Sequence, residues 1–126
     1  MNNRKPLLLI VDDNEDMRLY MRTELGKHYD IIEAENGVLG YDLAIRQQPD
    51  AIISDIVMPK MDGIELLKKL KSEPSVRNIP VMMLTAKQED ETLLEGLMYG
   101  ADDYIKKPFQ INILKVRLKN LLDGIA

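Results

Sequence analysis

The chain has 126 residues, 45% of them apolar, a formal net charge of −4 and no cysteine. This length is typical of one domain with its own core, and the lack of cysteine excludes disulfides and thiolate metal sites. The single histidine excludes multi-histidine metal centres, and the acidic balance argues against direct nucleic-acid binding by this segment, because domains that bind nucleic acid carry a basic face.

Short apolar runs alternate along the chain with longer amphipathic stretches. In chain order the pattern predicts strand 6–11, helix 15–26, strand 30–34, helix 38–48, strand 51–54, helix 63–72, strand 80–84, helix 89–99, strand 103–106 and helix 110–122. Five strands separated by helices indicate an α/β domain, with a parallel sheet covered by helices on both faces. Residues 7–11 and 81–84 are apolar throughout, as central strands are, whereas 30–34 is more polar and is expected at an edge. We expect a single domain over residues 1–126, with its core at about 6–122.

Local signals mark several of the expected boundaries. Asn36 and Gly37 are typical of a turn. Asp62 followed by Glu65 is a capping-box pattern, which predicts a helix that begins directly after Asp62. Gly100 is expected to end the fourth helix as a C-terminal cap.

Polar residues follow the predicted strands at the edge where an open parallel sheet binds its ligands. Asp12 and Asp13 follow the first strand, Asp55 the third, Thr85 the fourth and Lys107 the fifth. Because the carboxyl ends of parallel strands meet at one edge, we expect three carboxylates, one hydroxyl and one ammonium to converge there.

Three carboxylates at close range repel one another, and a hard divalent cation removes the conflict. Asp13 and Asp55 suit direct ligation of Mg²⁺ or Mn²⁺, Asp12 suits a role through water, and the main-chain carbonyl of Val57 offers a further oxygen. A carboxylate at such a metal is also a potential nucleophile toward phosphorus. Lys107 would pair with one phosphoryl oxygen, and the hydroxyl of Thr85 would donate to another.

Four segments in this order resemble the receiver domain of bacterial two-component response regulators. They are Val11–Asn14, Ser54–Gly63, Leu84–Ala86 and Gly100–Phe109. The resemblance runs from about Leu7 to Leu122, and the motifs are specific as a set rather than singly. The sequence of residues 98–109 and 118–122 is similar to that of receivers within hybrid sensor kinases.

The resemblance implies a doubly wound sheet of strand order 2-1-3-4-5. It also implies that Asp55 is the phosphoacceptor, that Asp12 and Asp13 complete the acidic pocket, and that Thr85 and Lys107 contact the phosphoryl group. Tyr104 would be the switch aromatic that turns inward once Thr85 moves. Such a domain is a signalling module rather than an enzyme, accepting its phosphoryl group from a histidine kinase or a phosphotransfer domain in a cytoplasmic phosphorelay.

Each of these residues also has an ordinary structural interpretation. Asp12 and Asp13 are explained by capping of the first helix, with Asp13 as N-cap. Asp55 is explained as a strand-end acid, Thr85 as a loop hydroxyl and Lys107 as a solvated lysine. These interpretations together require all five residues to share one sheet edge by chance.

Other functions fit the same residues less well. A magnesium-dependent phosphohydrolase with an aspartyl nucleophile often has Asp-x-Asp after its first strand, but Asp55 follows the third strand and is followed by Val57 at that offset. A flavin-binding domain would need a phosphate-binding loop after the first strand. In this chain acids stand at that place, and they would repel a phosphate in the absence of a metal. A receiver-like scaffold would not need the complete set of acidic and basic residues.

Apolar residues outside the predicted core stripes indicate partner surfaces. Ile113 and Val116 lie off the core stripe of the last helix, and we expect them to form a partner or dimer surface beside the fourth helix and fifth strand. Leu19 lies off the stripe of the first helix and is expected to help dock the kinase. No apolar run approaches the roughly 20 residues that span a bilayer, and no export signal is evident, so we expect a cytoplasmic location without membrane contact.

Overall fold

Five strands form one parallel sheet in the computed structural model, which describes residues 4–85 and 100–124. The strand order is β2-β1-β3-β4-β5, which confirms the predicted topology. The strands are β1 (Leu7–Val11), β2 (Asp30–Ala34), β3 (Ala51–Asp55), β4 (Val81–Thr85) and β5 (Asp103–Lys106). The helices are α1 (Glu15–Leu25), α2 (Gly37–Gln47), α3 (Gly63–Ser72) and α5 (Ile111–Leu122). The helix predicted over residues 89–99 lies outside the described residues.

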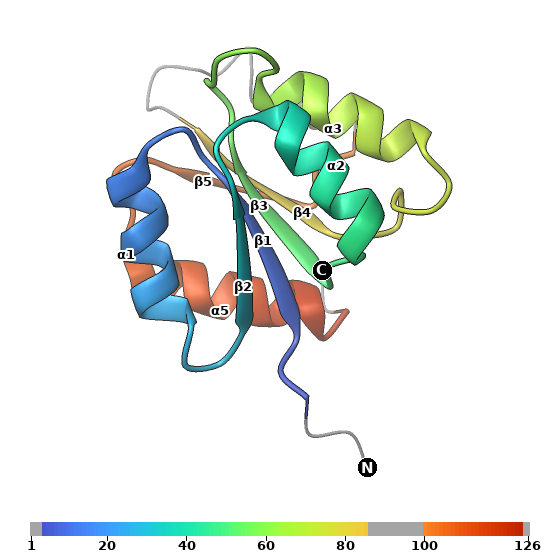
Figure 1. The fold of residues 1–126 in the computed structure, drawn as a ribbon. Coiled ribbons are helices and arrows are strands. Elements are labelled where there is room, and N and C mark those ends of the chain that lie inside the picture. Colours follow the sequence, from blue (N-terminus) through green and yellow to red (C-terminus); the bar gives the residue numbers. More distant parts are fainter. Residues whose placement is uncertain (1–3, 86–99, 125–126) are drawn as a thin grey trace.

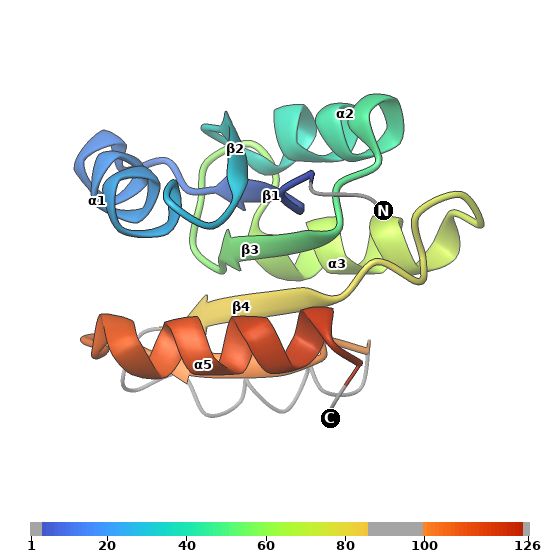
Figure 2. The same cartoon turned by 90° about the horizontal axis from the view of Figure 1, so that it is seen from below.

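Helices cover both faces of the sheet, with α1 and α5 on one face and α2 and α3 on the other (Figure 1). Figure 2 shows the same arrangement from below, with α5 in front of the sheet and α2 and α3 on the side away from α1. Along β1, Leu8 and Ile10 pack in the cluster beneath α1 and α5, whereas Leu9 and Val11 pack in the cluster beneath α2 and α3. Successive side chains of a strand point to opposite faces. A strand that is apolar at every position therefore fits a site that is buried on both sides.

The edge and centre of the sheet follow the apolar content of the strands. β3 and β4 lie between neighbours and are buried along their whole length, and β1 is also flanked on both sides. β2 is partly exposed and occupies an edge, as its sequence predicts. Each fully buried leucine or isoleucine contributes roughly 1.5–3 kcal/mol to the free energy of folding. The central strands therefore form a stable support for the residues at their carboxyl ends.

Side-chain caps fix where the helices begin. The α3 capping box is present as predicted: Asp62 Oδ1 accepts from the Glu65 N–H at 2.8 Å, and Glu65 Oε1 accepts from the Asp62 N–H at 3.4 Å. Asn36 is less a turn residue than the N-cap of α2, because its side chain accepts from the backbone N–H of Leu39.

The interpretation of Asp13 as the N-cap of the first helix is wrong. Asn14 takes that position, and its Oδ1 accepts from the Met17 N–H at 3.0 Å. An asparagine caps as well as an aspartate, so Asp13 is left outside the cap. Gly100 has a φ of 94°, in the left-handed region that favours glycine, and the helix it was expected to end lies outside the described residues.

Candidate functional site

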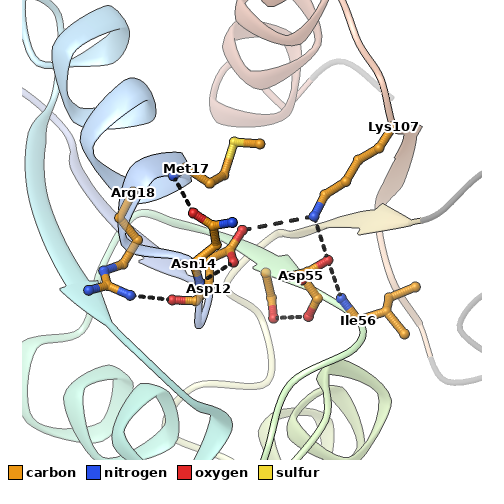
Figure 3. Close-up of polar contacts among 8 residues, drawn as sticks. Asp12, Asn14, Met17, Arg18, Asp55, Ile56 and Lys107 are labelled. Carbon is orange, nitrogen blue, oxygen red and sulfur yellow. Dashed lines mark hydrogen bonds and ion pairs between the residues drawn. The ribbon is translucent and has the colours of Figure 1, made fainter.

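Three carboxylates gather at the carboxyl edge of the sheet. Val11 pairs with Ser54 across β1 and β3, so the next residues on each strand, Asp12 and Asp55, come to the same place. Carboxylate oxygens of Asp12, Asp13 and Asp55 lie within 4.8 Å of one another. The predicted convergence of acids from two strand ends is therefore present, and Figure 3 shows Asp12 and Asp55 turned toward a common space.

Lys107 supplies the positive charge of this site. It follows β5, and its backbone N–H donates to the Thr85 carbonyl at 2.7 Å, which holds the two strand ends together. Its Nζ lies 2.9 Å from Asp55 Oδ1 and 4.0 Å from Asp12 Oδ2 (Figure 3). The Lys107–Pro108 peptide bond is cis. The ammonium is thus placed between two of the acids, as expected from the sequence.

Asp12 is the most deeply buried of the acids, with 1% of its surface exposed. Its Oδ1 accepts from the Asn14 N–H at 2.9 Å, whereas its buried Oδ2 has no hydrogen-bond partner in the described part of the chain. Burial is the main cause that raises the pKa of this carboxyl above 3.8, and the charges of Asp55 and Asp13 raise it further against the opposing effects of the Asn14 N–H and Lys107. A buried, crowded carboxylate of this kind is a strained feature that a cation would relieve.

The backbone around Asp55 is tightly packed. Asp55 is 9% exposed, and its Oδ1 accepts from the Ile56 N–H at 3.0 Å as well as from Lys107. The next helix begins at Gly63, whose N–H donates to the Ile56 carbonyl at 2.7 Å. A Cβ on Gly63 would contact the main-chain oxygen of Asp55 and lie 2.8 Å from Ile56 Cα. Only glycine allows this close approach of the α3 start to the main chain of Asp55 and Ile56.

Thr85 and Tyr104 flank the site on the next two strands. Thr85 ends β4, is 1% exposed, and pairs in register with Lys106. Tyr104 lies on β5 and packs against the apolar cluster beneath α2 and α3. Its hydroxyl is buried and finds no hydrogen-bond partner among the described residues, and burial raises its pKa to about 12. Tyr104 is thus both a core residue and a buried polar group near Thr85's strand.

The remaining predicted residues lie at the surface. Val57, two positions beyond Asp55, is 61% exposed, and whether its carbonyl serves as a metal ligand remains a prediction. Leu19 on α1 and Ile113 and Val116 on α5 are also exposed, as their place off the core stripes predicts. These three belong to helix surfaces rather than to the acidic edge.

One contact of the acidic edge was not predicted from the sequence. Arg18 Nη1 donates to the main-chain carbonyl of Asp12 at 2.6 Å, and Arg18 Nε pairs with Glu33 Oε1 at 3.2 Å. Figure 3 shows the guanidinium directed at the Asp12 backbone. A periodic pattern of apolar residues carries no signal for such a bond, because it joins α1 to the loop before it and to the edge strand.

The donor set at this edge fits a hard divalent cation. Three carboxylates offer only oxygen ligands, and no histidine or cysteine is present among them. Mg²⁺ and Mn²⁺ prefer carboxylate, carbonyl and water oxygens. The orphaned Oδ2 of Asp12 shows that the described residues alone do not balance the site. Of the described helices, none is long and apolar enough to cross a membrane.

Comparison with known proteins identifies relatives along almost the whole chain. A family model described as the response regulator receiver domain matches residues 8–119. The chain is 41% identical over 120 residues to histidine kinase P4 of Formosa agariphila, covering 95% of this chain and 9% of that protein. It is 40% identical over 116 residues to the phosphate regulon transcriptional regulatory protein PhoB of Pseudomonas aeruginosa, covering 91% of this chain and 51% of that protein.

A solved structure agrees in fold. The receiver domain of sensor histidine kinase PA1611 from Pseudomonas aeruginosa PAO1, solved with a magnesium ion coordinated in its active-site cleft, superposes with a TM-score of 0.87 at 26% identity. The superposition covers 94% of this chain and 98% of that one. The chain spans about a tenth of the kinase relative and about half of the regulator.

Proposed function

The chain belongs to the response regulator receiver domain family of two-component systems, and on that premise we propose that Asp55 is the residue that accepts the phosphoryl group. The observation that carries this assignment is the meeting of Asp55 with two further acids and with Lys107 Nζ, which is 2.9 Å from its Oδ1. A carboxylate in such a setting is held ready to attack phosphorus, with a cation opposite to balance charge on the transferred group.

The proposed donor is the phosphohistidine of a histidine kinase or of a phosphotransfer domain. An oxygen of the Asp55 carboxylate attacks the phosphorus, a P–O bond forms, the P–N bond breaks, and its electron pair returns to the imidazole nitrogen. Oδ1 is occupied by the Ile56 N–H and by Lys107, so we assign the attack to Oδ2. Hydrolysis of the aspartyl phosphate then returns the domain to its resting state.

Lys107 and Thr85 are proposed to hold the transferred group. The Lys107 ammonium already pairs with Asp55 and would pair with an oxygen of a phosphoryl group carried by that residue. Thr85, at the end of the neighbouring strand, would donate its hydroxyl to a second oxygen. Tyr104 would be the switch aromatic behind Thr85, and its inward position, already adopted here with the hydroxyl buried, would be the one that the phosphoryl group stabilises. Its buried hydroxyl has no hydrogen-bond partner in the described part of the chain, and a buried polar group without a partner favours a functional role for this side chain.

Mg²⁺, or Mn²⁺ in its place, is the proposed cofactor. Asp13 and Asp55 would bind it directly, Asp12 through water, and Val57 through its main-chain carbonyl. When bound, the cation would neutralise negative charge on the phosphoryl group and align it. The crowding of three acids supports this site, as does the magnesium in the cleft of the PA1611 receiver.

Exposed apolar residues are the proposed contacts with other proteins. Leu19 on α1 would help dock the phosphodonor, and Ile113 and Val116 on α5 would join a homodimer surface built from the predicted fourth helix, β5 and α5. The exposure of all three side chains supports these roles. Light scattering with and without beryllofluoride should show a change of mass with concentration, and an Ile113→Glu variant that dimerises like the native chain would exclude the dimer surface.

The wider setting is also a proposal. We propose a cytoplasmic domain, where a kinase has access to ATP, with no direct contact of this segment with nucleic acid or membrane. The similarity to histidine kinase P4 supports an origin in a hybrid sensor kinase, and the similarity to PhoB supports a regulator. Because the sequence of residues 98–109 resembles receivers of hybrid sensor kinases, we favour an origin in a hybrid sensor kinase.

Incubation with acetyl phosphate and Mg²⁺ followed by intact-mass measurement tests the acceptor. The native chain should gain one phosphoryl group, and Asp55→Asn should gain none. Asp42→Asn is a matched control, since Asp42 is an exposed acid of α2 paired with Arg46 and should be phosphorylated like the native chain. A native chain that gains no mass would favour the scaffold alternative. Steady release of phosphate from other phosphate esters would favour the phosphohydrolase.

A further inference from the structure

An arginine of α1 and a glutamate of β2 contact the acidic edge, which is the cluster of Asp12, Asp13 and Asp55, on its backbone side. We propose that Arg18, held by Glu33, is a positioning residue for the metal site, and that it fixes the backbone of Asp12 so that the acids of this loop face the cation. The proposal rests on the proposed function, because it assumes that the three carboxylates bind a divalent metal.

Both main-chain polar groups of Asp12 are fixed to the end of β2. Its N–H donates to the Ala34 carbonyl at 3.0 Å. Its carbonyl accepts from Arg18 Nη1 at 2.6 Å, and Arg18 is in turn paired with Glu33, the residue before Ala34. With Oδ1 held by the Asn14 N–H, Oδ2 is the hydrogen-bonding atom of Asp12 that stays without a partner among residues 4–85 and 100–124. The direction of this carboxylate therefore depends on the anchor at its carbonyl.

Arginine suits this role because of its shape. Its planar guanidinium carries several N–H donors in a fixed arrangement, so one side chain can bind a carbonyl and a carboxylate at once. The Arg18 side chain is 16% exposed and that of Glu33 is 23% exposed, so solvent competes little for either group. Glu33 also pairs with Arg22, one turn further along α1. The glutamate offsets the charge of Arg18, which would otherwise oppose cation binding nearby.

The position of Arg18 distinguishes positioning from a general effect of charge. Removal of a positive charge near a cation site should strengthen cation binding by electrostatics alone. Loss of an anchor should weaken it, and outer-sphere partners of metal ligands typically contribute about 10–100-fold in affinity. The two explanations thus predict changes of opposite sign for the same substitution.

Arg22 provides the matched control. It lies on the same helix, pairs with the same Glu33, and makes no contact with Asp12 among its described hydrogen bonds. Electron paramagnetic resonance of the free ion measures how tightly each variant binds Mn²⁺ alone. We expect Arg18→Met to bind Mn²⁺ about tenfold more weakly than the native chain. Arg22→Met should bind as tightly as the native chain or slightly more tightly. Arg18→Lys should recover part of the affinity, because an ammonium can donate to the carbonyl but cannot bind it and Glu33 in the same fork.

The outcomes separate this inference from the proposed function. A native chain that binds no Mn²⁺ overturns the metal site itself. Native binding with an Arg18→Met affinity equal to or above that of Arg22→Met overturns the positioning role alone. Urea unfolding without metal shows whether Arg18→Met is folded. Should it not fold, Arg18→Lys decides, since native affinity in that variant overturns the proposal and weaker affinity than in Arg22→Met supports it.

Discussion

Replacement of Asp12 by asparagine should stabilise the metal-free domain. Asparagine has the same shape and keeps an oxygen to accept the Asn14 N–H, which Asp12 Oδ1 now accepts at 2.9 Å. The substitution therefore removes one negative charge without removing that hydrogen bond. Because the acids are crowded for function rather than for stability, relief of the repulsion should raise the free energy of unfolding.

The separations in the site give the size of the effect. Carboxylate oxygens of the three acids lie within 4.8 Å, where two unit charges repel by about 3.5 kcal/mol at an effective dielectric constant near 20. Lys107 Nζ lies 4.0 Å from Asp12 Oδ2 and attracts it by about 4 kcal/mol on the same basis. The two repulsions on Asp12 exceed this attraction, and after screening by salt and by solvent at the exposed Asp13 we expect a net gain of about 1–2 kcal/mol.

Urea unfolding with a chelator present measures this gain, which corresponds to a midpoint higher by roughly 0.5–1 M. The pH dependence gives a second check. Burial and the neighbouring acids raise the folded-state pKa of Asp12 above 3.8. Between the unfolded-state pKa, near 3.8, and the raised folded-state pKa, the folded chain binds more protons than the unfolded chain. The free energy of unfolding therefore increases as the pH falls through this range. The repulsion is fully present above the raised pKa, and the advantage of Asp12→Asn should shrink as the pH falls toward 3.8.

A lower urea midpoint for Asp12→Asn at neutral pH without metal would refute the reasoning. An advantage that stays constant from neutral pH down to pH 3.8 would refute its electrostatic part, because the Asp12 carboxylate should have gained its proton in the folded chain over that range. Asp13→Asn should change the midpoint in the same direction but by less, because Asp13 is exposed.

Other predictions concern the cation and the backbone. Mg²⁺ at about 100 times its dissociation constant should stabilise the native chain by about 2.7 kcal/mol and raise its melting temperature by several degrees, and an unchanged thermal melt at millimolar Mg²⁺ would count against the site. Gly63→Ala should lower the free energy of unfolding by roughly 1–3 kcal/mol, because its Cβ would lie 2.8 Å from Ile56 Cα; an unchanged urea midpoint would show that this backbone yields. Asp62→Ala should cost about 1 kcal/mol through loss of the capping box, and a midpoint within error of the native one would contradict that.

The sheet could be predicted because its signal is local and strong. In Val81–Thr85 every residue before the final threonine is apolar. Such a strand is stable only when both of its faces are covered. The acids were then located by the rule that parallel strands present their carboxyl ends together. The joint placement of Asp12, Asp55 and Lys107 follows from that rule, and the structure places them together.

The contacts that could not be predicted depend on geometry across elements. Asp13 and Asn14 are equally good caps, and the choice between them depends on where the chain leaves β1. Asn36 and Gly37 fit a turn as well as a helix start, because the same residue types serve both. The bond from Arg18 to Asp12 depends on the distance between α1 and the end of β2, which no periodicity within a single segment records.

The separation in sequence between Asp55 and its ammonium partner has a consequence during synthesis. The two residues are 52 positions apart, and all three acids of the cluster are made before Lys107. At translation rates of about 5–20 residues per second, the lysine follows the last acid by roughly 3–10 seconds. A nascent chain that pairs its first and third strands in this interval carries an uncompensated acidic cluster. Cations of the surrounding medium are then its available counter-charge until the fifth strand emerges.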